Sequence, residues 1–315
     1  MTKISIVGCG NHVKKNILPA IDRMNDLEVD AVYVRDPRKV EMTLKFDGVK
    51  VQNIGNSVAE DVEWVYISTP ISSHYELVKS FIFLGKNVIC EKPLTDSLNR
   101  TIELFELADK LNVKLYEVNM FQYHELYRHL SQVVKESYSN LICLKAKFSI
   151  PHLASNDIRY KKELGGGALL DVGYYPLTLI ASMFGAPVDI RSTQFGRPEY
   201  EVDLFGAAVL DYEGFYCIAE WGIGGLYANE VEVITDTKSF FYERIFSKPN
   251  TFQASVLINN SAGEEKIGIG ADDQFANMLR SFIFSVNNHY DYKDQCDLTR
   301  CVSDLMSDIK TSSRG

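Results

Sequence analysis

The chain has 315 residues, 46% hydrophobic and 24% charged, which fits a folded globular protein of about two domains and excludes disordered and fibrous classes. The 42 acidic residues outnumber the 33 basic ones, so the net charge is −9 and no basic surface for nucleic acid is expected. The six cysteines form no C-x-x-C pair, the amino terminus has no long apolar leader, and no run of about eighteen apolar residues is found. These features predict free thiols, a cytoplasmic location and no membrane span.

Short apolar runs alternate with helical periodicity over residues 1–120, which is the pattern of β-α-β units that build a parallel sheet. Between two of these runs, Leu77, Val78, Phe81 and Ile82 fall at helical spacing and Gly85 is placed as a helix stop. The predicted strands are Ile4–Val7, Val29–Val34, Val49–Val51, Trp64–Ser68, Val88–Glu91 and Lys114–Val118.

Beyond about residue 120 the pattern changes to strict alternation, as in residues 143–150, where Leu144, Ala146, Phe148 and Ile150 are expected to face inward. Similar alternation recurs in residues 204–210, 215–221 and 252–258, and it predicts an open, mainly antiparallel sheet. The fold class is therefore α/β, with a parallel sheet in a domain over residues 1–120 and an α/β domain over residues 121–315. Helices are predicted at Leu169–Phe184, Gln274–Val286 and Leu298–Ile309. Because these helices do not cover both faces of a broad sheet, a homo-oligomer, dimer or tetramer, packed through this sheet is expected.

The first strand runs into a helix through Gly8-Cys9-Gly10-Asn11-His12. Two glycines there let the backbone turn sharply and approach a pyrophosphate, which free amides at the helix amino terminus bind. Val13 replaces the third glycine of the usual fingerprint, which should push helix and strand slightly apart. The motif indicates a dinucleotide-binding Rossmann domain, and the alternative is a tight strand-to-helix turn without a ligand.

The second strand ends at Val34 and is followed by Arg35-Asp36-Pro37-Arg38. An NAD site places a carboxylate at this strand end, whereas an NADP site replaces it with a neutral residue and an arginine that pairs with the 2′-phosphate. Val34 followed by Arg35 matches the second arrangement, and a charge-assisted bond to phosphate contributes on the order of 1.5–3 kcal/mol. Asp36 would serve an NAD ribose if the register shifted by two. NADP(H) is therefore the preferred cofactor and NAD(H) the alternative.

Two further strand ends carry functional candidates. Ser68-Thr69-Pro70 forms a turn that can pass under a nicotinamide ribose, with His74 entering the next helix, where a structural cap is the alternative role. Glu91-Lys92-Pro93 ends another strand, and proline fixes the backbone where a side chain must be aimed. Because ligands of open parallel sheets bind at the carboxyl ends of strands, Lys92 is the first candidate for a functional lysine.

The substrate side is expected at Gly165-Gly166-Gly167 and the residues that follow. Asp171 and Tyr175 are four residues apart and would share one helix face. Pro176 breaks a regular helix unless the helix is irregular or begins nearby. The alternatives are a helix cap for Asp171 and a buried aromatic with a satisfied hydroxyl for Tyr175.

The segment His124–His129 looks like a zinc-protease signature, but its second histidine comes one residue too late to share a helix face with the first. No metal site is predicted.

Taken together, Gly8-Cys9-Gly10, Thr69-Pro70 with His74, residues 85–93 and residues 165–173 resemble the glucose-fructose oxidoreductase / inositol dehydrogenase (Gfo/Idh/MocA) family over nearly the whole chain. The resemblance implies a Rossmann domain, a second domain with an open antiparallel sheet, oligomers that pack through that sheet, and nicotinamide-dependent redox chemistry on sugars, cyclitols and related compounds. The residues expected to bind the cofactor are Gly8, Gly10, Asn11, His12, Arg35, Arg38, Ser68, Thr69, Pro70, His74, Glu91 and Lys92.

By the same resemblance, Lys92 matches the active-site lysine of the family and Asp171 its substrate-binding aspartate. Many members have histidine four residues after that aspartate, whereas this chain has Tyr175. The tyrosine resembles the branch of glucose-fructose oxidoreductase, dihydrodiol and xylose dehydrogenases and nucleotide-sugar ketoreductases, where it is the proton donor. The family often has arginine at Gln122 and proline at Glu125, so the substrate contacts of this chain should differ there.

The resulting hypothesis is hydride transfer between NADP(H) and a secondary alcohol or ketone of a sugar or nucleotide-sugar, with Lys92, Tyr175 and Asp171 as catalytic residues. A tyrosine of pKa near 10 needs roughly 3–4 kcal/mol to act near neutrality, and a lysine charge about 4 Å away supplies on the order of 4 kcal/mol. The alternatives are an NAD-dependent sugar, cyclitol or dihydrodiol dehydrogenase, a Rossmann reductase of an open-chain or tetrapyrrole substrate, and a regulator that senses the nicotinamide cofactor without catalysis.

Overall fold

The computed structural model describes residues 1–41, 49–55, 57–285 and 292–312. Contacts divide the chain into two compact units, Met1–Val118 with Phe275–Cys296, and Asn119–Gln274 with Asp297–Gly315. The segment 275–296, which the sequence analysis placed in the carboxy-terminal domain, therefore clusters with the amino-terminal residues. Each unit is described by itself.

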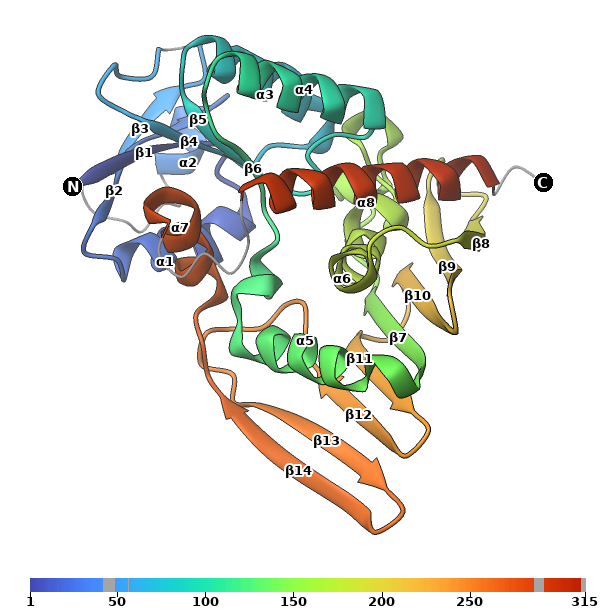
Figure 1. Ribbon diagram of the computed structural model, residues 1–315. Coiled ribbons are helices and arrows are strands. Elements are labelled where there is room, and N and C mark those ends of the chain that lie inside the picture. Colours follow the sequence, from blue (N-terminus) through green and yellow to red (C-terminus); the bar gives the residue numbers. More distant parts are fainter. Residues whose placement is uncertain (42–48, 56, 286–291, 313–315) are drawn as a thin grey trace. The chain divides into compact units, whose positions relative to one another are not determined.

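The first unit contains a six-stranded parallel sheet in the order β3-β2-β1-β4-β5-β6 (Figure 1). The chain builds β1, β2 and β3 outward in one direction and then returns to place β4 on the other side of β1. The strand order thus reverses between β1 and β4, which is where open α/β sheets bind ligands. The strands are β1 Thr2–Val7, β2 Leu27–Val34, β3 Lys50–Asn53, β4 Trp64–Ile67, β5 Asn87–Cys90 and β6 Leu115–Glu117.

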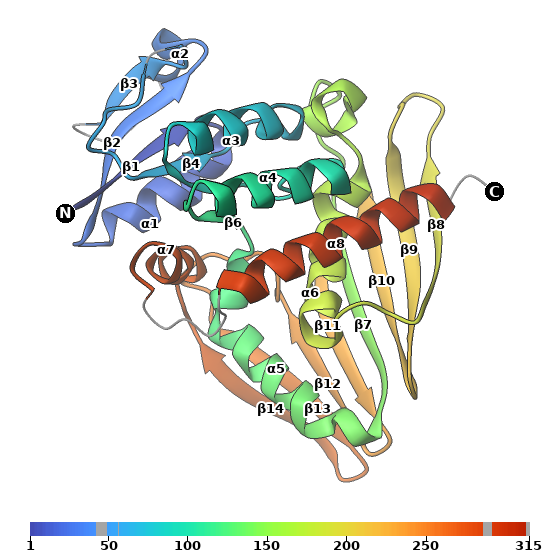
Figure 2. The same cartoon turned by 45° about the horizontal axis from the view of Figure 1, so that its top comes forward.

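Helices of the first unit pack on this sheet because its central strands are buried on both faces. Helices α3 and α4 lie side by side (Figures 1 and 2). The helices are η1 Val13–Ile17, α1 Leu18–Asp22, α2 Pro37–Glu41, η2 Ile71–Ser73, α3 His74–Phe83, α4 Leu98–Lys110, α7 Gln274–Phe284 and the start of α8 Tyr292–Ser312. The predicted helix Gln274–Val286 corresponds to α7, and its last residue, Val286, lies outside the described residues.

Aromatic side chains attach the segment 275–296 to the first unit. Phe282 of α7 stacks on Tyr116 of β6 with a centroid distance of 4.1 Å, and Trp64 stacks on the same tyrosine at 6.2 Å. The amide of Leu115 donates to the Tyr292 hydroxyl at 3.1 Å. These contacts join two stretches of chain that are far apart in sequence.

The second unit contains an eight-stranded sheet in the order β14-β13-β12-β11-β7-β10-β9-β8, in which only β7 and β10 pair in parallel. Its strands are β7 Leu141–Ile150, β8 Asp189–Gly196, β9 Asp203–Tyr212, β10 Phe215–Ile223, β11 Ala228–Thr235, β12 Lys238–Glu243, β13 Ala254–Asn260 and β14 Gly263–Gly270. Its helices are η3 Met120–Tyr123, α5 Glu125–Ser137, η4 Tyr138–Asn140, η5 Ile158–Tyr160, η6 Lys162–Leu164, η7 Leu169–Gly173, α6 Tyr174–Phe184 and most of α8. The predicted fold class, a parallel Rossmann sheet and a mainly antiparallel sheet in an α/β protein, is confirmed.

Side chains on the two faces of the second sheet differ in character. Leu144, Ala146 and Phe148 of β7 are buried, as predicted, whereas Ile150 at the strand end is only partly buried. Helix α6 packs against β7 and β10. On the other face, Lys145 pairs with Glu232 and Lys147 with Glu220, each at 3.1 Å. This alternation gives the period of two that predicted the strand.

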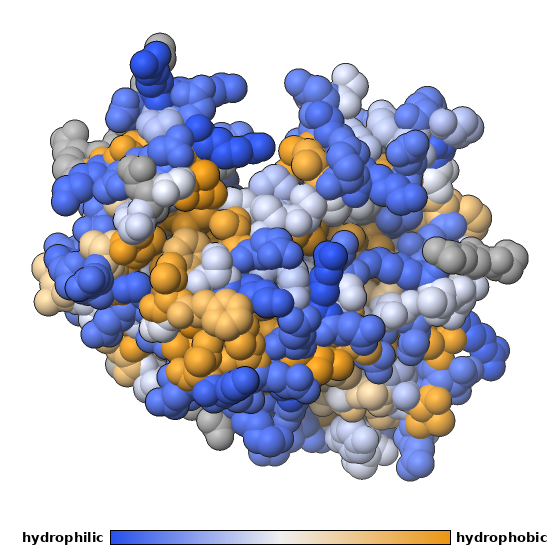
Figure 3. Space-filling model, turned by 90° about the horizontal axis from the view of Figure 1, so that it is seen from above, coloured by the Kyte–Doolittle hydropathy of each residue, from blue (hydrophilic) through white to orange (hydrophobic). Residues whose placement is uncertain are grey.

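One helical run in the described residues, Lys162–Phe184 with a mean hydropathy of 1.2, has the length and composition of a membrane span. The structure buries 78% of its most apolar window, which is the behaviour of a core helix. Exposed large hydrophobic side chains are spread along the chain, for example Phe83 in α3 and Val188 and Leu226 in loops. In the view of Figure 3, hydrophobic patches are interrupted by hydrophilic residues.

Candidate active site

The turn after β1 lies where the strand order of the first sheet reverses. Gly8 has φ +94°, and a Cβ there would lie 2.2 Å from the carbonyl oxygen of Ser68, so only glycine fits. A Cβ on Gly10 would meet no atom within 4 Å. The helix begins at Asn11, so Gly10 borders open space beside a helix amino terminus. This arrangement fits a dinucleotide pyrophosphate.

The helix after this turn is irregular. Residues Val13–Ile17 form a π-helix before α1. Pro19 lies in the first turn of α1, and because proline has no N–H, the regular hydrogen bond is missing there. Val13, which stands in place of the third glycine, is fully buried.

Arg35 and Asp36 follow the end of β2 and are exposed. The Oδ1 atom of Asp36 accepts from the amide of Lys39 at 3.4 Å, so this carboxylate caps the short helix α2. Arg38 lies on α2 and is also exposed. The carbonyl of Arg35 accepts a long hydrogen bond from the Asn53 amide at 3.4 Å. Asp36 therefore has a structural task at this strand end.

The turn after β4 is closed by its own side chains. Ser73 Oγ lies 2.8 Å from Thr69 Oγ1 and 2.7 Å from the carbonyl of Pro70. The amide of Ser68 donates to the carbonyl of Val7 at 2.8 Å, which ties this turn to the glycine turn. His74 is fully buried at the start of α3. The tight turn predicted at Ser68-Thr69-Pro70 is present.

Glu91 precedes Lys92 at the end of β5 and lies in a polar cluster. His12 Nε2 is 2.8 Å from Glu91 Oε1, and the Tyr66 hydroxyl donates to the same oxygen at 2.5 Å. Burial raises the pKa of Glu91, but the charge and hydrogen bond of His12, the bond from Tyr66 and the charge of Lys92 outweigh it and lower the pKa to about 2. Glu91 is therefore an anion beside Lys92.

In the second unit, residues 165–171 are held by close backbone packing. A Cβ on Gly166 would lie 2.5 Å from the carbonyl oxygen of Arg159, and one on Gly167, at φ +122°, would lie 2.5 Å from Asp203 Oδ1. Asp203 Oδ2 accepts from the amide of Leu169 at 2.7 Å. These two glycines are required by contacts within the unit, in addition to any approach to a ligand.

Asp171 lies in the π-helix η7, and α6 begins at Tyr174. Pro176 thus falls in the first turn of α6. The helix before it is irregular and α6 begins nearby, which are the two conditions under which a proline is tolerated here. The Nε atom of Arg159 donates to Asp171 Oδ2 at 2.5 Å, and the same arginine pairs with Asp157. The pair of Asp171 and Arg159 was not foreseen, because no motif marks Arg159.

Tyr175 is 9% exposed and lies among aromatic rings. The centroid distances are 5.0 Å to Phe148, 5.8 Å to Phe246 and 6.2 Å to Phe121. Its neighbour Tyr174 is fully buried, and the Tyr174 hydroxyl donates to Asn119 Oδ1 at 2.8 Å. The two adjacent tyrosines therefore differ in surroundings.

Gln122 is a further candidate that lies in the short helix η3. It is 2% exposed, and neither polar atom of its amide has a hydrogen-bond partner among the described residues. A buried, unsatisfied amide is costly, so Gln122 suits a position that a ligand completes.

The histidines of the segment 124–129 have separate structural contacts. His124 Nδ1 accepts from the amide of Leu126 and so caps α5, and His129 Nδ1 lies 3.1 Å from the Tyr242 hydroxyl. No group of three or more His, Cys, Asp or Glu side chains that could hold a metal ion occurs within the described part of the chain.

Comparisons with known proteins cover both units. Residues 2–119 match the oxidoreductase family with an NAD-binding Rossmann fold, and residues 132–240 match the GFO/IDH/MocA C-terminal domain. The dTDP-3,4-didehydro-2,6-dideoxy-alpha-D-glucose 3-reductase of Actinomadura kijaniata is 28% identical over 317 residues, which cover 99% of this chain and 96% of the relative. The reductase of the same name from Saccharopolyspora spinosa is 30% identical over 286 residues, which cover 89% of this chain and 86% of the relative.

Solved structures agree with these relatives. KijD10, a 3-ketoreductase from Actinomadura kijaniata in complex with NADP and TDP-benzene, has a TM-score of 0.91 at 26% identity, covering 99% of this chain and 97% of that chain. The family resemblance seen in the sequence is therefore confirmed. The chain belongs to the Gfo/Idh/MocA family and is an NAD(P)-dependent oxidoreductase.

Proposed function

We propose that the chain is an NADPH-dependent ketoreductase that acts on a secondary ketone of a nucleotide-linked sugar. The observation that carries this proposal is the match, over nearly the whole length of both chains, to reductases named for a dTDP-linked keto sugar. A solved relative with the same coverage binds NADP and TDP-benzene.

Residues of the first unit would hold the cofactor, which supplies the hydride when it is bound. Gly10 and Asn11 would receive the pyrophosphate, and Arg35 would pair with the 2′-phosphate. Asp36 already caps α2. This supports Arg35, rather than Asp36, as the residue that binds the 2′-position of the ribose. This arrangement favours NADPH over NADH.

Lys92 and Tyr175 are the proposed catalytic pair. The phenol of Tyr175 gives its proton to the substrate oxygen as the carbonyl is reduced, and the Lys92 ammonium stabilises the negative charge that develops on that oxygen. The charge of Lys92 is one of the causes that lower the pKa of Glu91, so the lysine has an ionised carboxylate near it. In the oxidative direction the same two groups act in reverse.

Asp171 is proposed to accept a hydrogen bond from a sugar hydroxyl. Arg159 beside it donates to one oxygen of the carboxylate and so orients the group. A carboxylate accepts hydrogen bonds, and a sugar hydroxyl is a matching donor.

The proposal also includes a cellular location and an oligomeric state. All six cysteines are free, which supports a reducing cytoplasm. The open sheet of the second unit supports a homo-oligomer.

Turnover of a dTDP-linked 3-keto sugar, followed by nicotinamide absorbance, tests the function. We expect NADPH to support the reaction better than NADH. Lys92→Ala and Tyr175→Phe should each lower kcat by about a hundredfold or more while the protein still binds NADPH. Tyr174→Phe is the matched control, because it removes the hydroxyl of the adjacent tyrosine, and it should retain turnover. Full activity of either catalytic variant would refute the assignment.

A further inference from the structure

Arg244, the residue after β12, has a backbone conformation that is unusual for an arginine. Its φ is +53°, in the left-handed region that glycine or asparagine usually occupies. The side chain is half-buried, and its guanidinium carbon lies 5.5 Å from the ring centroids of both Tyr227 and Phe252, within the range of cation–π contacts. Residues in such conformations cluster at functional sites, where the surroundings stabilise the strained backbone.

Asn229 holds this conformation in place. Its backbone carbonyl accepts from the amide of Arg244 at 2.6 Å, and its side-chain Oδ1 accepts from the amide of Phe246 at 2.9 Å. Its Nδ2 atom donates to the carbonyl of Ser247 at 2.9 Å and to the Tyr227 hydroxyl at 3.0 Å. Because Asn229 is 3% exposed, one buried side chain fixes both the arginine segment and a ring that contacts the guanidinium.

The strand register places Arg244 and Tyr227 at one edge of the sheet of the second unit. The parallel strands β7 and β10 end there side by side. Strand β11 runs antiparallel to β7 and begins there, directly after Tyr227, and β12 runs antiparallel to β11 and ends there, directly before Arg244. The chain that continues from β7 carries Arg159, the partner of Asp171. Arg244 therefore lies at the sheet edge that leads into the proposed substrate site.

Aromatic contacts connect this edge with the proposed catalytic tyrosine. Phe148 of β7 contacts Tyr227 at a centroid distance of 6.4 Å and Tyr175 at 5.0 Å. Phe246, two residues after Arg244, lies 5.8 Å from Tyr175. Two rings, Tyr227 and Phe148, thus connect the guanidinium to Tyr175.

The guanidinium of Arg244 is available to an anion. Within the described residues it makes no hydrogen bond or ion pair, whereas Arg159 at the same edge pairs with Asp171 and Asp157. A guanidinium that contacts rings through its π face keeps N–H groups at its edge, and their fork fits two phosphate oxygens. Because the net charge of the chain is −9, a phosphate group needs a local cation.

We propose that Arg244 binds the diphosphate group of a nucleotide-linked substrate and that Tyr227 holds the guanidinium in place for it. The inference rests on the proposed function, because the diphosphate is a part of such a substrate that a free sugar lacks. It assigns substrate affinity, rather than the chemical step, to this residue. Loss of the guanidinium should therefore raise KM and leave kcat at saturation within about threefold of the wild-type value.

Calorimetric titration of the full-length protein, loaded with NADPH, with dTDP tests the site without turnover. Arg244→Ala should weaken dTDP binding about ten- to a hundredfold, because a charge-assisted contact to phosphate is lost. Arg244→Lys, which keeps the charge without the fork, should recover part of that affinity. Arg244→Gly relieves the positive φ, so it should fold normally and still lose dTDP affinity. The dissociation constant for NADPH should stay within about threefold in every variant.

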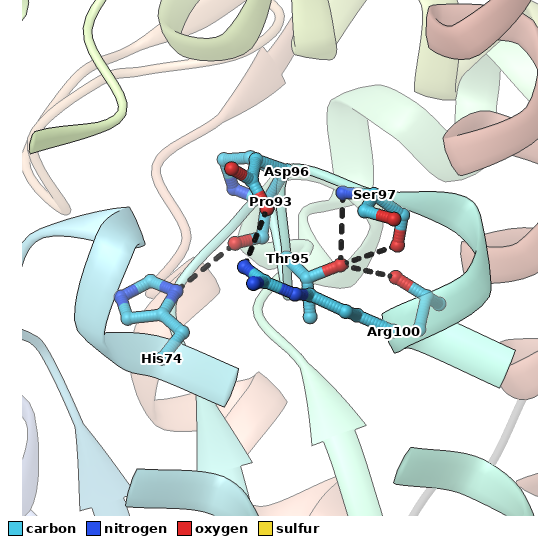
Figure 4. Close-up of polar contacts among 7 residues, drawn as sticks. His74, Pro93, Thr95, Asp96, Ser97 and Arg100 are labelled. Carbon is cyan, nitrogen blue, oxygen red and sulfur yellow. Dashed lines mark hydrogen bonds and ion pairs between the residues drawn. The ribbon is translucent and has the colours of Figure 1, made fainter. Parts of the chain in front are cut away.

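Arg100 offers a matched control in the first unit. Its guanidinium carbon lies 5.2 Å from the ring centroid of Tyr75, but one of its nitrogens pairs with Asp96 at 3.4 Å, as Figure 4 shows. The control therefore shares the arginine–tyrosine contact and has its own counter-ion. Arg100→Ala should leave dTDP binding unchanged. An equal loss for Arg100→Ala, unchanged dTDP binding by Arg244→Ala, or no binding of dTDP by the wild type would overturn the site.

Turnover of a dTDP-linked 3-keto sugar separates this site from the proposed function. If the wild type reduces the sugar and Arg244→Ala does so with an unchanged KM, the diphosphate site is wrong and the function stands. If dTDP binding depends on Arg244 but the sugar is not reduced, the proposed reaction is wrong and the site stands.

Discussion

Arg35 is the residue proposed to distinguish NADPH from NADH. Arg35→Ala should weaken NADPH binding by about ten- to a hundredfold, because a charge-assisted bond to phosphate contributes on the order of 1.5–3 kcal/mol. NADH binding should change little. Fluorescence titration with both cofactors measures this, and Arg38→Ala tests whether the second exposed arginine shares the task. Equal losses for NADPH and NADH would contradict the role in phosphate recognition.

Glu91 links the site to acid stability. Its pKa is lowered from 4.5 to about 2, so the ionised carboxylate stabilises the fold above about pH 4.5, and this stabilisation disappears as the pH falls toward 2. Glu91→Gln should lower the free energy of unfolding at neutral pH by on the order of 2–3 kcal/mol, and the difference from wild type should shrink below pH 4.5. Urea unfolding across that pH range measures both effects.

Glu103 is the control for this prediction. It pairs with Lys79 at 2.7 Å, but its side chain is 50% exposed. Because solvent screens exposed ion pairs, Glu103→Gln should change stability little at any pH. A pH profile of Glu91→Gln parallel to that of wild type would show that the carboxylate is not the stabilising group.

The sequence named candidate site residues that lie in motifs and gave little or no signal for those that do not. Gly8, Lys92 and Asp171 belong to local patterns with a physical requirement at each position. Arg159 belongs to none, because its importance comes from its partner Asp171. Gln122 was marked only as a departure from the family pattern, and the burial of its amide without a partner in the described residues was not foreseen. Such relations become visible only once the chain is folded.

The β1 turn allows its two glycines to be tested against each other. Gly8→Ala places a Cβ against the backbone of Ser68 at a positive φ, so it should destabilise the fold and displace the turn. Gly10→Ala meets no atom of the structure and should fold with an unchanged melting temperature. Because the new methyl group occupies the space proposed for the pyrophosphate, Gly10→Ala should still weaken NADPH binding by about tenfold or more. Normal NADPH binding by a folded Gly10→Ala variant would exclude this turn as the pyrophosphate site.

Strands were easier to predict than helix irregularities. Apolar runs and alternation placed the ends of β4 and β7 within two residues of those observed, because burial of one or two faces acts on every residue of a strand. The π-helical segments at Val13–Ile17 and Leu169–Gly173 have no periodic signal. Pro176 pointed to an irregularity near the second segment, and no expectation was drawn for the first. A proline shows where a regular bond is missing without showing how the backbone compensates.

At the scale of the whole molecule, the chain crosses between units in a way that no local pattern reveals. The sequence changes its pattern near residue 120, which predicted a single boundary there. Residues 275–296 instead return to the first unit, through Phe282 and Tyr292. Contacts between segments more than 150 residues apart produce no periodic pattern in the sequence. The predicted continuous domain 121–315 therefore included residues 275–296, which cluster with the first unit.

This division can be tested because each unit contains one of the two tryptophans, Trp64 and Trp221. Phe282 is 3% exposed and stacks on Tyr116, so Phe282→Ala should cost roughly 3–5 kcal/mol. Urea unfolding would be followed by fluorescence in Trp221→Phe and Trp64→Phe backgrounds, which report the first and the second unit. The Trp64 transition should move to lower urea by more than the Trp221 transition, because the lost contact belongs to the first unit. Phe83→Ala removes a phenylalanine that is 61% exposed in α3 and should shift neither transition. A larger shift at Trp221 after Phe282→Ala would show that residues 275–296 support the second unit instead.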